Sequence, residues 1–179
     1  LLFLSTNLYA GQFGKYESDL VLGLHFNETS GIPQDVNGST WIVVGSPTRS
    51  TAVGKFDGGI GLLNTSTTYL QMKPTTALLG ITKAITIIMW FKPTIALTSP
   101  LRFILCHNFD IEVGYQGANV DFNLDTIEGG GDEARGNSLQ VLNQWGHIAC
   151  TWGGNDPNMR IYYNGKEAGE ISSPTPKAS

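Results

Sequence analysis

The stretch from residue 143 to residue 165 reads NQWGHIACTWGGNDPNMRIYYNG, and it decides the fold class of this chain. Aromatic and β-branched residues recur in residues 144–152 and again in residues 159–163, which is typical of β-strands. The GGNDPN segment between them is a turn cluster, and Asn164-Gly165 supplies the two residues of positive φ that a type I′ hairpin turn requires. The stretch therefore predicts a strand, a turn, a second strand and a hairpin turn, and it contains no recognisable catalytic constellation.

The same pattern extends over most of the chain. Short apolar runs rich in β-forming residues are separated by Gly, Pro, Asn, Asp and Ser, and no stretch keeps a helical period over more than about ten residues. This spacing predicts an all-β, two-sheet antiparallel sandwich. Residues 84–91 are apolar on both faces, which predicts a central strand covered on each side. The other runs are residues 20–26, 40–44, 59–63, 69–72, 101–106, 109–113, 120–124 and 138–142.

Length and charge narrow the classes of function. A chain of 179 residues can bury a sizeable core, so we expect a sandwich domain over residues 19–179, preceded by a strand or arm over residues 1–18. The apolar start also fits the tail of a clipped signal peptide. The net charge of −4, with no basic block, argues against nucleic acid as a partner. No run reaches the roughly 18 apolar residues of a membrane span, so membrane insertion is not expected.

Four segments, in this order, resemble the laminin G-like branch of the concanavalin A-like lectin/glucanase superfamily. They are LVLGLHFNETSG at residues 20–31, GKFDGGIGL with the following YL at residues 54–70, AITIIMWFKP at residues 84–93, and QWGHIA through YYNG at residues 144–165. The resemblance implies a jelly-roll sandwich. It also implies a non-catalytic carbohydrate-binding or adhesion module that is extracellular, on a cell surface or a virion, with a glycan or a protein as its partner.

The chain departs from the family pattern in two places. The family usually closes with a further strand, which residues 172–179 do not supply. We therefore expect residues 1–8 or a neighbouring subunit to pair with the open sheet edge, the second case giving a homo-oligomer or larger assembly. Pentraxins carry a Cys two places after the His that matches His147, whereas this chain has Ala149 and then Cys150, so the pentraxin disulfide does not carry over. Cys150 and Cys106 fit either free buried thiols or one bridge between strands.

Acidic residues gather in one part of the chain. Seven of its fifteen carboxylates lie between residues 110 and 133, an interval with no Lys or Arg. Apolar residues alternate with the acids in residues 110–113 and 120–125, so we expect a hairpin turning at residues 115–119 to place Asp110, Glu112, Asp121 and Asp125 on one face of a sheet. The glycine-rich residues 128–133 are predicted to be a mobile loop. Three interpretations follow: a solvated outer face, a face that binds sugar hydroxyls, or a Ca²⁺ site built from several oxygens. The acids are Asp110, Glu112, Asp121, Asp125, Glu128, Asp132 and Glu133.

Particular residues can be assigned to the two functional interpretations. For a glycan, Asp121, Asn123 and Asp125 would bond to hydroxyls, and Tyr115 or Tyr162 would stack on a pyranose face. For calcium, the candidate ligands are Asp35, Asp110 and Glu112, with Asp35 ranked first because the DVNG segment resembles a family turn that supports a structural ion. An Asx-turn explains Asp35 equally well.

The sequence also allows a test for catalysis. Retaining glucanases of the superfamily carry E-x-D-x-x-E on one strand, and NLDTIE at residues 123–128 matches only its last two acids. Asn123 stands where the nucleophile would be, and an amide cannot form the glycosyl ester, so we predict no enzyme. His147 lies two residues from Trp145 and is predicted to share its core face, as a buried histidine and not a base. The alternatives are a structural decoration or cement protein, and then a glycoside hydrolase or polysaccharide lyase.

Overall fold

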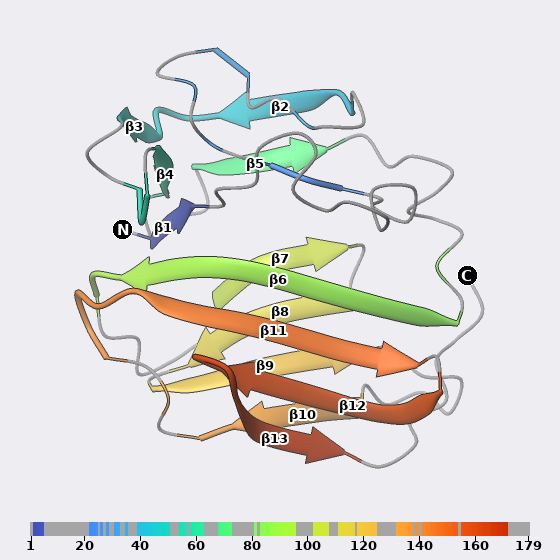
Figure 1. The fold of residues 1–179 in the computed structure, drawn as a ribbon. Coiled ribbons are helices and arrows are strands. Elements are labelled where there is room, and N and C mark those ends of the chain that lie inside the picture. Colours follow the sequence, from blue (N-terminus) through green and yellow to red (C-terminus); the bar gives the residue numbers. More distant parts are fainter. Residues whose placement is uncertain are drawn as a thin grey trace. The chain divides into compact units, whose positions relative to one another are not determined.

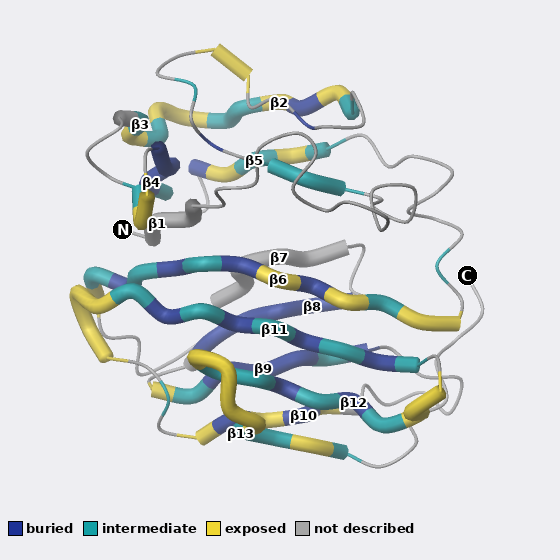
Figure 2. The backbone as a smooth tube through the Cα atoms, in the orientation of Figure 1, coloured by how far each residue is buried: buried dark blue, intermediate teal, exposed yellow. Residues whose placement is uncertain are grey.

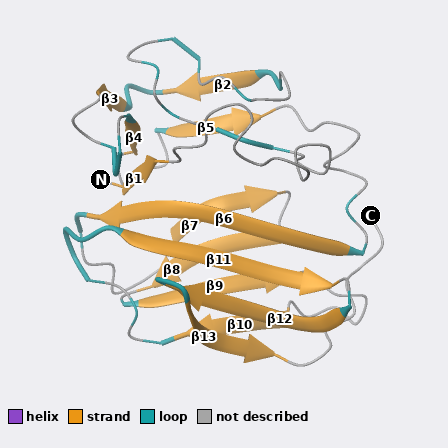
Figure 3. Ribbon diagram, viewed as in Figure 1, coloured by secondary structure: helices purple, strands orange, loops and turns teal. Residues whose placement is uncertain are grey.

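The structure is a computed structural model of the chain. Every regular element in the residues it describes is a β-strand, so the all-β prediction is confirmed (Figure 3). The described residues include no helix with the length and apolar character of a membrane span. The described residues are 2–5, 22–24, 26, 28, 31–32, 35, 39–50, 54–56, 58–62, 68–72, 81, 83–95, 102–107, 111–116, 118–124, 132–137, 139, 141–153 and 155–171.

The chain divides into two compact units. The first comprises Leu1–Gly80 with Trp90–Lys92, and the second comprises Ile81–Met89 with Pro93–Ser179. The expected division at residue 18 stays a prediction, as does assembly through an open sheet edge. In the first unit, β1 and β3 each pair antiparallel with β4, and β2 pairs antiparallel with β5 (Figure 1). The strands are β1 (Leu2–Ser5), β2 (Trp41–Val44), β3 (Thr48–Ser50), β4 (Gly59–Leu62) and β5 (Tyr69–Met72).

The second unit contains two antiparallel sets of strands. One runs in the order β13-β12-β11-β6 and the other in the order β10-β9-β8-β7. The two sets pack against each other, with β12 and β13 contacting β10 and β12 contacting β9 (Figure 1). The strands are β6 (Ala84–Pro93, of which Trp90–Lys92 is counted with the first unit), β7 (Arg102–His107), β8 (Ile111–Gln116), β9 (Asn119–Leu124), β10 (Asp132–Gly136), β11 (Gly146–Gly153), β12 (Asp156–Tyr163) and β13 (Lys166–Ile171).

The core of the second unit comes from alternate residues of these strands. Buried residues alternate with partly exposed ones along all of β11, and they do so in β12 between Asn158 and Tyr162 (Figure 2). Such alternation arises because successive side chains of a strand point to opposite faces. The two sets therefore close over a shared apolar layer, and the predicted antiparallel sandwich is confirmed. Residues with no exposed surface in this layer are Val113, Val120, Phe122, Ala134, Ile148, Cys150, Met159 and Ile161.

Two predictions about buried faces are wrong. β6 is not covered on each side throughout, because Ile88 is 55 % exposed although Ile87 and Met89 are buried. His147 does not lie on the core face of β11, because the buried positions are Ile148 and its alternate neighbours along the strand. His147 is half-buried on the opposite face, and this partial burial lowers its pKa. Alternation therefore identifies residues that share a face, but it does not say which face meets the core.

The cysteine on β11 is a free thiol. Cys150 has no exposed surface, and its burial raises the pKa of the thiol well above the usual range. Burial in apolar surroundings disfavours the thiolate, which is the reactive form of cysteine. Cys150 is therefore a small core residue, as one of the two sequence interpretations expected, and no disulfide joins it to Cys106.

Candidate functional site

Five polar residues of neighbouring strands lie on the face of the β8–β10 sheet opposite the core, and together they are called the polar face here. On β9, Asn123 pairs with Glu112 of β8 on one side and with Glu133 of β10 on the other. Two residues earlier on β9, Asp121 pairs with Arg135 of β10. The residues between them in sequence are buried in the core, so these side chains project from the other face.

One guanidinium joins two carboxylates on this face. Arg135 Nε lies 2.6 Å from Asp121 Oδ1, and an Nη of Arg135 lies 2.5 Å from Glu133 Oε1. The Asp121 side chain has no exposed surface, whereas 42 % of the Arg135 side chain and 37 % of the Glu133 side chain are exposed. A buried carboxylate thus holds one side of a guanidinium whose other side reaches solvent.

The protonation of this group follows from its contacts. The hydrogen bond to Asp121, and then the charge of Asp121, raise the pKa of Arg135, so the guanidinium stays charged. The pKa of Glu133 is also raised, first by burial and then by the negative charge of Asp121, while Arg135 opposes the shift. Glu133 therefore binds a proton more readily than an isolated glutamate does.

Asp121 has one oxygen without a partner. Among the described residues, none donates a hydrogen bond to its buried Oδ2. A buried acceptor left unpaired typically costs about 1–3 kcal/mol, so such an atom needs a physical explanation. The position is also unusual for its face, because Asp121 is as fully buried as the core residues that flank it in sequence.

The structure brings together part of the residue set predicted for a glycan. Asp121 and Asn123 share the polar face, and Asp125 lies outside the described residues. Tyr115 is only 5 % exposed and pairs with the core residue Val120, so its ring is not available to stack on a sugar. Tyr162 belongs to β12, in the other set of strands. The two predicted tyrosines therefore do not join the polar face.

The interpretation of this face as a solvated surface is wrong for two of its acids. Glu112 is 9 % exposed and Asp121 has no exposed surface. The exposed part of the face is instead Glu133 and Arg135 on β10. Arg135 was not predicted as a site residue, because the candidates came from the acidic interval that ends two residues earlier, at residue 133. The signal in the sequence that could have predicted strand β10, and with it Arg135, is the DEARG segment at residues 132–136, where Ala134 lies between two charged residues after a glycine-rich turn.

Comparison with known sequences identifies the family. Residues 64–179 match the family model described as the concanavalin A-like lectin/glucanases superfamily. The chain belongs to this superfamily. The match includes all the strands of the polar face, and it agrees with the antiparallel sandwich of the second unit. A search of curated protein sequences gives no match.

Solved structures of the same fold include bacterial toxin binding domains. The binding domain of Paraclostridial Mosquitocidal Protein 1 is 16 % identical with a TM-score of 0.67, and the alignment covers 85 % of this chain and 39 % of that chain. The binding domain of Botulinum neurotoxin DC in complex with rat synaptotagmin II is 18 % identical with a TM-score of 0.67, covering 88 % and 40 %. The same domain in complex with SialylT is 17 % identical with a TM-score of 0.63, again covering 88 % and 40 %. This superfamily member thus spans about two-fifths of the length of each.

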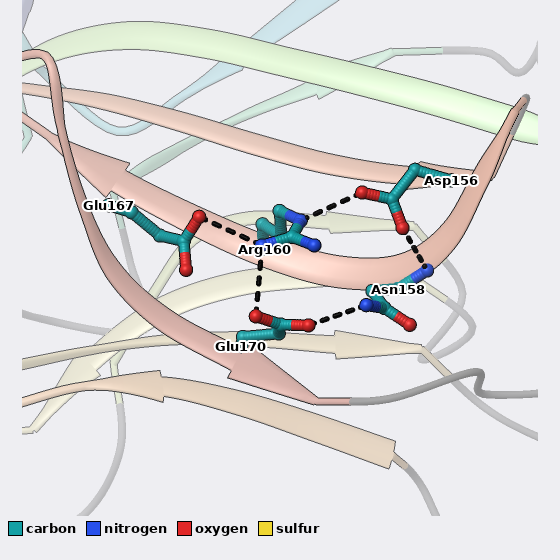
Figure 4. A network of polar contacts seen from close by, with 5 residues as sticks. All are labelled: Asp156, Asn158, Arg160, Glu167 and Glu170. Carbon is teal, nitrogen blue, oxygen red and sulfur yellow. Dashed lines mark hydrogen bonds and ion pairs between the residues drawn. The ribbon is translucent and has the colours of Figure 1, made fainter.

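Figure 4 shows a second ionic group, on β12 and β13, which provides a comparison for the polar face. Arg160 Nε lies 2.9 Å from Asp156 Oδ2, and one Nη lies 2.8 Å from Glu167 Oε2 and 2.9 Å from Glu170 Oε2. Asn158 donates to both Asp156 and Glu170. All three carboxylates are partly exposed, at 53 %, 45 % and 34 % of their side chains. This group ties β13 to β12 and, unlike the polar face, contains no fully buried acid.

The candidate calcium ligands are placed as follows. Asp35 is buried, and its two carboxylate oxygens accept hydrogen bonds from the backbone N–H groups of Gly23 and Ser39, at 2.8 Å and 3.0 Å. These bonds account for an acid at this position without a metal. Glu112 lies on the polar face, and Asp110 is outside the described residues. In the part of the chain that the structure describes, no three metal-binding side chains converge.

Calcium binding therefore stays a prediction, and a thermal melt tests it. An ion that binds only the folded chain would raise the free energy of unfolding by about 2.7 kcal/mol at a hundredfold excess over Kd. The predicted result is a higher Tm in CaCl₂ than in EDTA, with NaCl of matched ionic strength as the control. Equal Tm values in the two conditions would contradict the prediction of calcium binding.

Proposed function

We propose that this chain is a non-catalytic carbohydrate-recognition module that works outside the cell, on a cell surface or a virion. Its ligand would bind along β10 and β9, at Arg135, Glu133 and Asn123. The observation that supports this site is the position of Arg135. Buried Asp121 binds one side of its guanidinium, and 42 % of the Arg135 side chain is exposed. Superfamily membership and a related fold solved in complex with SialylT support a glycan as the partner, and the synaptotagmin II complex supports a protein as the alternative.

The chemistry of the three side chains suits sugar hydroxyls. A hydroxyl donates one hydrogen bond and accepts others, while arginine donates, carboxylate accepts and an amide does both. Arg135 is already ordered by two ion pairs before a ligand arrives. Ordering a long side chain on binding costs about 0.5–1.5 kcal/mol, so this arrangement spares part of that cost.

The charge of the polar face favours uncharged glycans. It holds three acids, Glu112, Asp121 and Glu133, and one guanidinium. An anionic sugar would approach Arg135 beside the Glu133 carboxylate that already contacts it. We therefore expect neutral glycans to bind more tightly than sialylated or sulfated ones, and a glycan array compares the three directly.

Asn123 supports the absence of catalysis. It occupies the position of the nucleophile in the E-x-D-x-x-E pattern, and it lies on β9 between Glu112 and Glu133. An amide cannot form the covalent intermediate of a retaining glycosidase. Release of reducing sugar from a bound polysaccharide would contradict this part of the proposal.

Arg135→Gln is the variant that tests the site. Loss of the charged donor is expected to weaken glycan binding about tenfold to a hundredfold, because hydrogen bonds to charged groups contribute about 1.5–3 kcal/mol. Calorimetric titration with a neutral glycan selected on the array measures the change in Kd.

Arg160→Gln is the matched control for this experiment. It removes the same charge from another acid-bound arginine, on the exposed face of β12. Its Kd should equal that of the unaltered protein. Equal losses in the two variants would place the site elsewhere, and an unaltered protein that binds no glycan would overturn the proposed ligand class.

A further inference from the structure

The unpaired oxygen of Asp121 calls for a hydrogen-bond donor. Its Oδ1 is bonded to Arg135 at 2.6 Å, whereas its Oδ2 is buried and has no donor among the described residues. A sugar hydroxyl would not reach an atom with no exposed surface unless neighbouring groups moved. A donor on a neighbouring side chain of the polar face is the alternative.

Glu133 is the neighbour that can carry this proton. It contacts the same guanidinium as Asp121, at 2.5 Å, and its side chain interacts with that of Asp121. An ionised carboxylate has no hydrogen to donate, but a protonated one has an O–H. We propose that protonated Glu133 donates a hydrogen bond from its O–H to Asp121 Oδ2, so that the two side chains and Arg135 form one unit that completes the recognition face at mildly acidic pH and loosens as the proton leaves Glu133. This inference rests on the proposed function for its effect on binding.

The charges around Glu133 support this assignment. With the proton present, the positive charge of Arg135 balances the single negative charge shared by Asp121 and Glu133. Without it, two carboxylates face one guanidinium. Glu112 of β8 lies on the same face, on the far side of Asn123 from Glu133. From β12 and β13, which pack against β10, the described ion pairs of Arg160 run to Asp156, Glu167 and Glu170 and not to Glu133. Burial and Asp121 raise the pKa of Glu133, while Arg135 alone lowers it.

The direction of the pH dependence follows from linkage. Because the pKa of Glu133 is higher in the folded chain, the folded chain binds this proton more tightly than the unfolded chain does. The stability that the proton contributes is therefore fully present below the ordinary glutamate pKa of about 4.3. It is lost as the pH rises through the raised pKa of the folded chain.

Carbon-detected NMR titration of the side-chain carboxyls tests the proton directly. Glu133 is expected to titrate above the ordinary glutamate pKa of about 4.3. In the Asp121→Asn variant the negative charge of Asp121 is gone, so the midpoint of Glu133 should fall toward that ordinary value. A midpoint at or below the ordinary value in the unaltered protein, or an unchanged midpoint in Asp121→Asn, would overturn the inference.

Glu133→Gln provides a second, independent measurement. Its amide N–H donates to Asp121 Oδ2 at every pH, so its Tm should exceed that of the unaltered protein by about 2 °C or more at pH 7.5, with a smaller difference at pH 4.5. Glu167→Gln, the control, should show no such widening between the two pH values. A Tm difference for Glu133→Gln that stays constant with pH would count against a shared proton.

Binding at two pH values separates this inference from the function on which it rests. The unaltered protein should bind its neutral glycan more tightly at pH 5 than at pH 7.5, and Glu133→Gln should lose that difference. If Glu133 titrates as expected but no glycan binds at either pH, the proposed function fails, while the hydrogen bond from protonated Glu133 to Asp121 is still supported. If a glycan binds equally at both pH values and Glu133 titrates at the ordinary glutamate pKa, the inference fails and the function stands.

Discussion

Replacing Phe122 with Ala is expected to lower the free energy of unfolding by about 3–5 kcal/mol. Phe122 has no exposed surface, and on β9 it lies between Val113 of β8 and Ala134 of β10. Its removal leaves a cavity in the layer between the two sets of strands, and the close packing of a core relaxes only partly around such a gap. Urea denaturation followed by circular dichroism measures the loss.

Ile88→Ala is the control for this variant. Ile88 is as apolar as Phe122, but it is 55 % exposed on β6 of the same unit. An exposed position of this kind usually changes stability by no more than about 0.5 kcal/mol. A loss in Phe122→Ala no larger than that in Ile88→Ala would mean that β9 is not part of the core.

Replacing Gly153 with Ala is expected to cost about 2–5 kcal/mol, for two reasons that add. Gly153 has a φ of +84°, a left-handed conformation that costs a residue with a Cβ about 1–2 kcal/mol. An added Cβ would also lie 1.9 Å from the carbonyl oxygen of Lys83, which is backbone and cannot turn aside. The backbone shift needed to separate β11 from the start of β6 would lower the free energy of unfolding by about another 1–3 kcal/mol.

Gly165→Ala separates the two costs. Gly165 has nearly the same φ, +81°, but nothing lies within 4 Å of a Cβ built there. This variant should show only the conformational part, about 1–2 kcal/mol, in the same urea experiment. Equal losses in Gly153→Ala and Gly165→Ala would mean that β11 does not approach Lys83 as closely as the structure shows.

Structure could be predicted most accurately from the sequence where it depends on a few neighbouring residues. The hairpin predicted at Asn164-Gly165 forms between β12 and β13, with φ angles of +50° and +81°. Alternation along β9 correctly separated Phe122 from Asp121 and Asn123. These features follow from the φ that a residue tolerates and from the two-residue period of a strand.

Three of the described strands were not predicted from the sequence, because of their position in the sheets. Each lies at the end of its set of strands: β3 with the sequence TRS, β10 with the sequence DEARG and β13 with the sequence KEAGEI. A strand at a sheet edge can form with few apolar residues, since backbone hydrogen bonds to the one neighbouring strand hold it in place. A search for apolar runs therefore does not find it. Because β10 was missed, the guanidinium of Arg135 was missed as a member of the candidate site.

Local patterns in the chain were enough to predict an all-β fold, the hairpin turn at Asn164-Gly165 and the shared face of Glu112 and Asp121. Three other features depended on which strands pair and pack: the inward position of Tyr115, the half-buried position of His147, and the meeting of Asp121 with Arg135 fourteen residues later. The physical reason is range. Alternation and turn geometry act between adjacent residues, whereas the choice of core face and the register of paired strands arise from contacts between segments that only folding brings together.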